Sequence, residues 1–226
     1  VYKRQEYETL PQESVAALMR EVKITNVTGE DLAVEAADGM AEVIPCGVSS
    51  TTMKDMGQTA KAWMEVRDVR NGVPKFRVRA SMEDSAEVTE AEGMNFAFAR
   101  GGEGEILPVI VDRELLFETD TALLRAWGFE REGVRLPDHK EQVTCNDTPC
   151  SFFLASRILK PGETLVMREL YGTAKEQTRI DRVWKLSGED GWFLGKQREA
   201  FALTEQITSR IAVKTGHAVF DAARII

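Results

Sequence analysis

The hydrophobic pattern of this chain changes its period near Gly172. Before that point, apolar and polar residues alternate over short segments separated by turn residues, which is typical of half-buried β-strands. After it, apolar residues recur at spacings of three and four, as in amphipathic helices. We therefore expect a β-rich domain over residues 1–172 and a helical segment over residues 173–226. The last nine residues resemble the start of another element, so we expect the chain to be a piece of a larger protein.

The alternating segments predict a series of short strands. They span residues 18–25, 32–36, 75–82, 95–99, 106–111, 152–158 and 165–170. Turn residues at 26–31 and 160–163 predict two hairpins, which pair the first strand with the second and the last two with each other. Residues 1–5 show no pattern, and residues 6–12 predict an extended lead-in. Short strands with turns at this spacing favour a mainly β fold, a large antiparallel β-sandwich.

Three segments have the pattern of helices. Residues 49–64 predict a helix inserted between strands, capped by Ser50, Thr51 or Thr52, with Met53, Met56, Ala60 and Trp63 on one stripe. Ile180, Val183 and Trp184 predict a second helix, which ends at Ser187–Gly188. A third, at about 191–213, is expected to bury Ala200, Leu203, Ile207 and Ile211. The last two would form a helical linker after the sandwich.

Composition excludes several classes of protein. A hydrophobic content of 43% with 29% charged residues can form a core, and a net charge of −8 disfavours a nucleic-acid or membrane surface. No apolar run approaches the roughly 20 residues of a membrane span, and no signal peptide is visible. Three cysteines are an odd number, which disfavours a disulfide framework and fits a reducing cytoplasm. We expect a cytoplasmic protein that binds neither nucleic acid nor membrane.

The residues with catalytic potential do not form a recognisable set. The acidic stretch 83–92 reads as a solvated strand end and loop, and His139 and His217 read as surface or boundary histidines. The glycine-rich stretch 101–104 lacks the Lys-Ser/Thr ending of a phosphate loop. Cys145 and Cys150 have too few histidine partners for a closed zinc site. We expect no catalytic residue, metal or cofactor in this chain.

One group of side chains has the composition of a sugar-binding surface. Arg77 and Arg79 alternate outward on a predicted strand, and Trp63 ends the inserted helix. An aromatic platform with arginine donors is a common way to hold a sugar, so these three residues are the candidate substrate-binding residues. Trp63 also falls on the apolar stripe of its helix, and core packing is the competing interpretation.

Several motifs together resemble a known enzyme family. Residues 38–47, DGMAEVIPCG, resemble the DGLPxxxPYG stretch in the N-terminal sandwich of family 94 glycoside phosphorylases, most closely the β-1,2-oligoglucan phosphorylases. Cys46 departs from the aromatic residue of that motif. Further similar stretches, in the same order, are residues 58–64, 76–85, 92–96, 140–144, 148–150 and 170–175. Residues 215–221 resemble the segment that leads into the catalytic barrel of the family.

The resemblance covers residues 6–226 and implies a function. Such enzymes cleave β-glucosidic bonds with phosphate, invert the anomeric centre and release α-glucose 1-phosphate, without metal or organic cofactor. Their general acid is one aspartate in an (α/α)6 barrel that follows the sandwich and linker. We therefore expect a non-catalytic sandwich and linker that is inactive alone. Its expected partners are the barrel of the same chain, a second subunit and a β-glucan oligosaccharide, with an exposed apolar patch on the linker helices.

Two other classes remain open. A free-standing carbohydrate-binding module would need a row of exposed aromatic residues, for which Trp63, Trp127, Trp184 and Trp192 are the large candidates. A complete sandwich enzyme of the sugar-epimerase kind would need a histidine pair and a glutamate in one cleft. The two histidines lie far apart in sequence, which disfavours that class.

Overall fold

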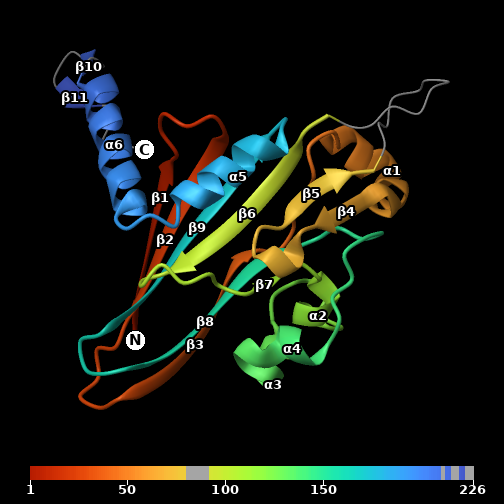
Figure 1. Cartoon of the computed structure of the whole chain (residues 1–226), viewed down its shortest axis with the longest axis horizontal. Coiled ribbons are helices and arrows are strands. Elements are labelled where there is room, and N and C mark those ends of the chain that lie inside the picture. Colours follow the sequence, from red (N-terminus) through yellow and green to blue (C-terminus); the bar gives the residue numbers. More distant parts are fainter. Residues whose placement is uncertain (80–91, 210–211, 215–218, 222–226) are drawn as a thin grey trace.

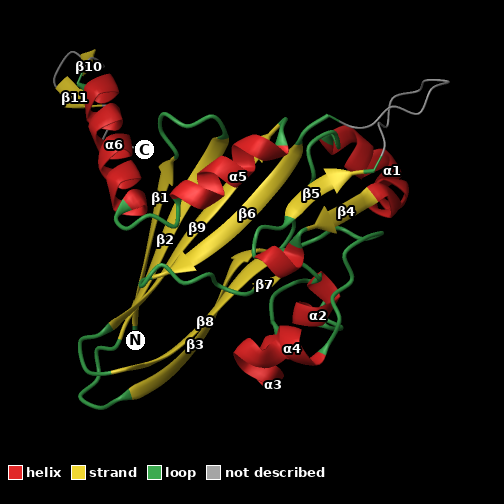
Figure 2. Cartoon of the chain, viewed as in Figure 1, coloured by secondary structure: helices red, strands yellow, loops and turns green. Residues whose placement is uncertain are grey.

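The fold consists of two antiparallel sheets packed face to face, with helices on the outside (Figures 1 and 2). The computed structural model describes residues 1–79, 92–209, 212–214 and 219–221. The larger sheet has the order β1 (Tyr2–Thr9), β2 (Ala16–Thr25), β9 (Thr164–Ala174), β6 (Met94–Gly101), β5 (Lys75–Val78) and β4 (Met64–Arg67). The smaller has the order β3 (Leu32–Met40), β8 (Ser151–Leu159) and β7 (Val109–Ile110). The predicted mainly β sandwich is confirmed.

The core between the sheets is apolar and drawn from both. Val22 and Met167 of the large sheet pack with Phe153 and Leu159 of the small one, and all four are fully buried. Such interdigitation of alternate side chains is how two sheets exclude water between them. The inward-facing positions of β2 and β9 were therefore readable from their alternation.

Both predicted hairpins are wrong, although their turns are placed correctly. β2 pairs with β9, bringing Thr25 opposite Thr164, and β3 pairs with β8, bringing Leu32 opposite Leu159. Each turn therefore takes the chain from one sheet to the other. The paired strands β2 and β9 continue through the two turns into the paired strands β3 and β8, so this two-stranded ribbon folds over on itself. Alternation shows which face of a strand is buried but does not show which strand lies beside it.

Asn26 holds the two turns together where the ribbon folds. Its side-chain Nδ2 donates to the carbonyl oxygens of Glu30 and Leu159, each at 2.8 Å. Its backbone N–H donates to Glu163 O at 2.9 Å, and its own carbonyl accepts from Gly162 N at 2.8 Å. Asn26 is fully buried, so these bonds satisfy polar groups that have lost water.

The N-terminal residues form more structure than the sequence indicated. Residues 1–5 carry no pattern, yet β1 begins at Tyr2 and pairs with β2 along its whole length. As an edge strand with charged residues at half of its positions, β1 matches the way exposed sheet edges avoid further pairing. An edge strand made mostly of polar residues lacks the alternation of apolar and polar residues by which central strands are recognised.

The inserted helix is confirmed as α1 (Ser50–Trp63), with a different cap from the predicted one. Ser49 is the N-cap, and its Oγ accepts the backbone N–H of Thr52 at 3.0 Å. Of the predicted stripe only Ala60 is buried, whereas Met56 and Trp63 are exposed. Ala60 is therefore the one member of the predicted stripe that is buried, and Met53 is intermediate.

Short helical segments between β4 and β8 lie beside the small sheet. They are η1 (Val69–Asn71), α2 (Arg113–Phe117), α3 (Trp127–Glu132), η2 (Gly133–Arg135) and α4 (Leu136–His139). Leu116 and Leu136 are fully buried and pack against Leu154 of β8. The predicted strand at 106–111 is reduced to β7, because the chain leaves the sheet toward these helices.

Two helices follow the sandwich, as the change of period predicted. α5 (Gln177–Leu186) ends where Ser187 begins, and α6 (Trp192–Thr208) follows it. α5 and the start of α6 cover the outer face of the large sheet, where Ile180, Val183 and Phe193 pack with Phe98 and Leu170.

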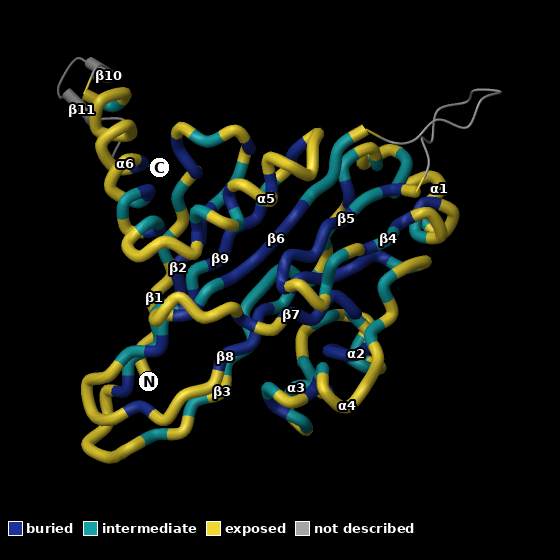
Figure 3. Tube along the Cα trace, in the orientation of Figure 1, coloured by how far each residue is buried: buried dark blue, intermediate teal, exposed yellow. Residues whose placement is uncertain are grey.

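The predicted third helix is wrong at its C-terminal end and in its buried face. It ends at Thr208, and the two-stranded sheet of β10 (Ala212–Lys214) and β11 (Val219–Asp221) follows. Ala200 is buried as predicted, but Leu203 and Ile207 are exposed, and Ile211 lies outside the described residues. The first half of α6 packs on the large sheet, whereas its second half extends past that sheet (Figure 3).

No helix in the described ranges has both the length and the apolar character needed to cross a bilayer.

Candidate functional site

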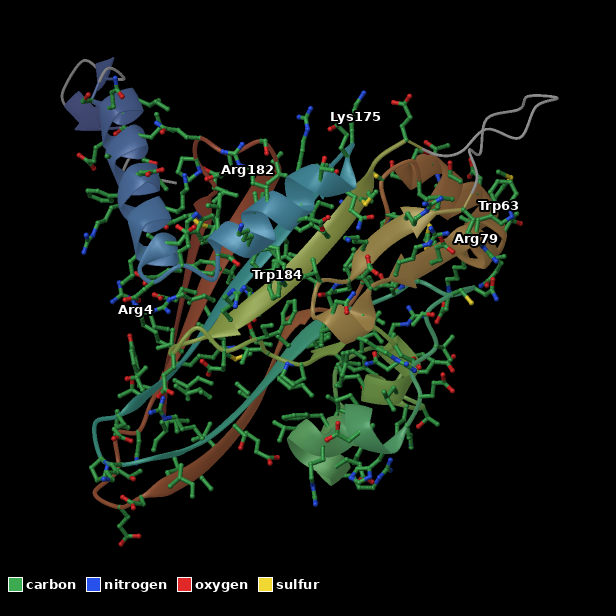
Figure 4. All side chains as sticks on the ribbon, viewed as in Figure 1. Arg4, Trp63, Arg79, Lys175, Arg182 and Trp184 are labelled. Atoms are coloured by element: carbon green, nitrogen blue, oxygen red, sulfur yellow. The ribbon has the colours of Figure 1, made fainter. Side chains whose placement is uncertain are left out.

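Two of the three predicted sugar-contacting residues lie side by side at one end of the large sheet (Figure 4). Trp63 is the last residue of α1, and Arg79 follows β5 directly. The backbone N–H of Arg79 donates to the carbonyl of Trp63 at 2.9 Å, which extends the pairing of β4 with β5 to these two residues. Trp63 is 36% exposed and belongs to none of the hydrophobic clusters found among the described residues.

The guanidinium of Arg79 connects the helix end to a neighbouring loop. Its Nη2 donates to Asn146 Oδ1 at 2.5 Å and also to the carbonyl oxygen of Ala62. Asn146 has a positive φ of 67°, a conformation that asparagine tolerates better than most residues. An exposed indole, a guanidinium and an amide thus share one patch, the Trp63 patch, whose members are Trp63, Arg79 and Asn146.

Arg77 belongs to a separate ion pair. It lies opposite Glu65 in the β4–β5 ladder, and its Nε is 3.1 Å from Glu65 Oε1. Arg67 contacts the same carboxylate oxygen at 2.8 Å. The structure therefore brings Trp63 and Arg79 together. Arg77 is separate from them, because its ion pair with Glu65 joins β4 to β5.

The remaining candidates gain no chemical role from their positions. His139 ends α4, Cys145 is exposed and Cys150 is buried, and burial raises the pKa of the Cys150 thiol. Residues 83–91 of the acidic stretch and His217 lie outside the described residues. Across the described parts of the chain, no three His, Cys, Asp or Glu side chains gather in a way that could hold a metal ion.

Sequence reasoning missed a buried polar cluster inside the sandwich, the Arg20 cluster of Arg20, Asp38, Glu169 and Tyr171. Arg20 Nε donates to Glu169 Oε2 at 2.8 Å, and its Nη2 lies 2.8 Å from Asp38 Oδ2. The Tyr171 hydroxyl donates to the same Glu169 oxygen at 2.6 Å. The cluster therefore ties β2 and β9 of the large sheet to β3 of the small one.

Burial controls the titration of this cluster. Desolvation raises the pKa of Glu169 to about 7 although Arg20 works in the opposite direction, and it also raises the pKa of Tyr171. Burial disfavours the charged form of Arg20 too, but Tyr171, Glu169 and Asp38 together raise its pKa. Glu169 Oε1 is buried and has no hydrogen-bond partner among the described residues.

A signal for the Arg20 cluster was present in the sequence. Arg20 stands between Leu18 and Val22, and Glu169 between Met167 and Tyr171, all at inward-facing positions. A charged residue that interrupts an apolar alternation needs a buried partner. When two strands of one sheet each carry such a charged residue, the two residues are expected to pair with each other.

No protein-family model matches the chain, and a search of curated proteins finds no relative. The function proposed below therefore rests on the motif resemblance, on the fold and on the residues of its surfaces.

Proposed function

We propose that this chain is the non-catalytic N-terminal sandwich and helical linker of an inverting β-glucan phosphorylase. The motif at residues 38–47 and the similar stretches after it suggest the family. The order of elements supports the proposal, since a two-sheet sandwich is followed by the two helices α5 and α6. The three free cysteines fit a protein of the reducing cytoplasm.

The exposed apolar surface of α6 is the observation that carries the proposal. The first half of the helix buries Phe193 and Ala200, and every residue from Phe201 to Ile207 is exposed. At 100° per residue, Leu203 and Ile207 continue the stripe of Phe193 and Ala200 beyond the end of the sheet. An apolar stripe that is covered over one half and uncovered over the other indicates a second body that covers the rest.

A second apolar line runs along the other side of the same helix. Leu194 and Phe201 are seven residues apart and so lie one above the other, and they are 43% and 65% exposed. Together with Leu203 and Ile207, these exposed apolar residues on two sides of the helix are named the α6 face. A helix with apolar residues on both sides is expected between two packed domains, and we propose that the (α/α)6 barrel of the enzyme is the second one.

In this proposal, the substrate is a β-1,2-oligoglucan and the products are α-glucose 1-phosphate and the shortened glucan. Phosphate attacks the anomeric carbon from the face opposite the leaving group, which inverts the configuration. The leaving oxygen takes a proton from an aspartate of the barrel. The sandwich contributes no catalytic residue, and it supports the barrel through the α6 face and contributes to a dimer interface.

Phosphorolysis tests the proposal directly. The chain alone and the same chain extended through the downstream reading frame are each incubated with β-1,2-glucooligosaccharides and phosphate. We expect α-glucose 1-phosphate from the extended protein and none from the chain alone. Release by the chain alone, or an extended protein that lacks both a barrel and activity, would contradict the proposal.

The Trp63 patch favours a second candidate, a free-standing carbohydrate-binding module. Its exposed indole and the Arg79 guanidinium are the elements of a sugar platform. In that case Trp63→Ala would abolish glucan binding by the isolated chain. Trp127→Ala is the matched control, because Trp127 is also exposed, at 41%, and lies beside an arginine. The Cζ atom of Arg125 is 3.6 Å from the centroid of the Trp127 ring.

A further inference from the structure

The two edges of the large sheet differ in what lies beside them. β4 forms one edge, and the chain itself covers it: Val66 N donates to Thr144 O at 2.7 Å, and Asn146 N donates to Met64 O at 3.1 Å. β1 forms the other edge (Figure 1). Among the described residues, no backbone hydrogen bond joins residues 2–9 to any segment other than β2. An open edge of this length is a template for a further strand.

Alternate residues of β1 direct their backbone groups to this open edge. In an antiparallel pair, residues that bond to the neighbouring strand alternate with residues whose N–H and C=O point away from it. Leu10 N donates to Ala17 O at 2.8 Å, and the register of β1 with β2 runs without interruption back to Tyr2. The even-numbered residues of β1 therefore bond to β2. The odd-numbered residues present their backbone groups outward, and all of them are exposed: Lys3, Gln5, Tyr7 and Thr9.

A second hydrogen bond, at the far end of β2, gives the same alternation. Asn26 N donates to Glu163 O at 2.9 Å, so the even-numbered residues of β2 bond to β9 and its odd-numbered residues bond to β1. The register places each odd-numbered residue of β2 opposite an even-numbered residue of β1. Two independent bonds thus identify the outward groups.

The charges of β1 are complementary to a second copy of the same strand. Lys3 and Arg4 make its first half basic, and Glu6 and Glu8 make its second half acidic. In an antiparallel pair related by a two-fold axis, the basic half of each strand lies opposite the acidic half of the other. Charges that oppose pairing with an unrelated strand therefore favour pairing of β1 with itself.

The charges also select one register. Outward backbone groups meet only where odd-numbered residues lie opposite odd-numbered residues, so the two-fold axis passes through a residue of β1. An axis at Arg4 would place Arg4 opposite Arg4 of the second copy, and an axis at Glu6 would do the same with two glutamates. Like charges directly opposite are destabilising. An axis at Gln5 places Arg4 of each copy opposite Glu6 of the other.

The geometry of the Gln5 register suits these ion pairs. Since Arg4 and Glu6 bond to β2, they form non-hydrogen-bonded pairs across the new edge, in which the Cα atoms are only about 4.5 Å apart. The two Glu6 residues lie on a diagonal, at roughly 7–8 Å. The side chains of Arg4 and Glu6 are 60% and 34% exposed and contact each other at 2.6 Å within the strand, so both can reach a partner. The remaining charged residues meet neutral ones, Lys3 opposite Tyr7 and Glu8 opposite Tyr2.

We propose that β1 pairs with β1 of a second copy of this chain, antiparallel and centred on Gln5, so that the two large sheets become one continuous sheet. The backbone groups of Lys3, Gln5 and Tyr7 then bond to those of Tyr7, Gln5 and Lys3 of the second copy. This pairing goes beyond the proposed enzyme function, because it needs neither a barrel nor a glucan.

Sedimentation velocity of the chain alone, over a dilution series, tests the proposal. We expect a dimer that dissociates on dilution, because one strand edge buries less surface than a permanent interface. Arg4→Glu and Glu6→Arg each place like charges opposite each other twice, and each should raise the dimer Kd at least about 10-fold. A mixture of the two variants restores both ion pairs, so we expect it to form a heterodimer as tightly as the wild type dimerises.

Disulfide trapping tests the register. In a Cys145→Ser background, which removes the exposed native thiol, Gln5→Cys places two thiols opposite each other with Cα atoms about 5.5 Å apart, within disulfide range. Lys3→Cys is the matched control, because its two thiols lie roughly 13 Å apart along the strands. We expect a linked dimer only from Gln5→Cys.

Three results would overturn the proposal. They are a chain that stays monomeric at every concentration, single charge variants that dimerise as tightly as the wild type, and equal linking of Gln5→Cys and Lys3→Cys. A monomeric chain would leave the open edge of β1 to a partner other than a second copy.

Discussion

Two neighbouring Arg–Glu ion pairs link β2 to β9 and face opposite sides of the large sheet. In one pair the arginine belongs to β2, and in the other it belongs to β9. Arg20 lies opposite Glu169, and the next pair along the ladder is Glu21 opposite Arg168. The first pair points into the sandwich, and the second points to the face on which α5 and α6 pack. Both carboxylates are almost completely buried, Glu169 at 0% and Glu21 at 3% exposure.

The pKa values of the two carboxylates move in opposite directions. Desolvation raises the pKa of Glu169 to about 7, whereas the pKa of Glu21 is lowered, since hydrogen bonds from Lys23 and Arg168 outweigh its desolvation. Glu21 has two cations, and the side chain of Arg168 is 19% exposed. Glu169 has one cation, which Asp38 also uses. Burial of the charge matters less than the number of cations that compensate it.

Removal of the inner cation is expected to give the largest effect. Arg20→Met leaves Glu169 and Asp38 without their buried partner, so the free energy of unfolding should fall by about 3–5 kcal/mol at pH 8. Arg168→Met on the other face should cost about 1 kcal/mol or less, because Lys23 still contacts Glu21. Urea denaturation of both variants measures the difference.

A double variant separates the pair from the packing around it. Arg20→Met with Glu169→Leu removes both inner charges and should recover most of the loss. If Arg20→Met and Arg168→Met cost the same, the two faces do not differ in the way described.

The pH dependence of stability follows from the raised pKa of Glu169. The native state holds a proton that the unfolded state releases near pH 4.5, so this group stabilises the fold most below pH 4.5. That contribution is lost as the pH rises toward about 7 and amounts to about 3 kcal/mol at 1.36 kcal/mol for each pH unit. Glu169→Gln should remove this part of the slope. An unchanged slope in Glu169→Gln between pH 4.5 and 7 would refute the assignment.

Loss of the Tyr171 hydroxyl should have a smaller effect. Tyr171→Phe removes the donor 2.6 Å from Glu169 Oε2 and one acceptor of Arg20 at 3.1 Å. We expect a loss of about 1–2 kcal/mol, larger at pH 8 than at pH 5, because the bond favours the ionised carboxylate. Thermal unfolding at the two pH values measures it, and an equal loss at both would show that Glu169 does not change charge.

Replacement of Glu21 should have the smallest effect on stability, and the pH dependence of that effect should have the opposite sign to that of Glu169. Its lowered pKa means that it stabilises the fold above its unfolded pKa, and this contribution is lost as the pH falls through the lower, native value. Glu21→Gln should therefore cost about 1 kcal/mol at pH 7 and much less at pH 3. A cost that grows on acidification would contradict the sign.

The sequence predicted the elements of this fold better than their neighbours. The positions of α1, α5 and the turn at 26–31 followed from helical periods and turn residues, which act locally. The pairing of β2 with β9 and of β3 with β8 could not be read, since in both cases the paired residues are more than a hundred positions apart. The same limit applies to the Arg20–Glu169 pair, whose members are 149 residues apart.

The candidate sites show a similar division. Trp63 and Arg79 were found by residue type, and the structure placed them together through backbone pairing. The course of residues 143–149 was not foreseen, because these residues have neither period and their shape comes from contacts with β4 and Val43. Irregular segments carry little local signal, and their role appears only once the elements that hold them are assembled.

The central claim, that α6 leaves the sandwich to support another domain, is tested most directly by hydrogen exchange on the amides of residues 201–207. These are measured in the chain alone and in the chain extended through the downstream reading frame, which the proposal expects to encode the barrel. We predict that exchange slows at least 10-fold in the extended protein, because burial of Phe201, Leu203 and Ile207 opposes local opening of the helix. Equal exchange rates in the two proteins would contradict the claim.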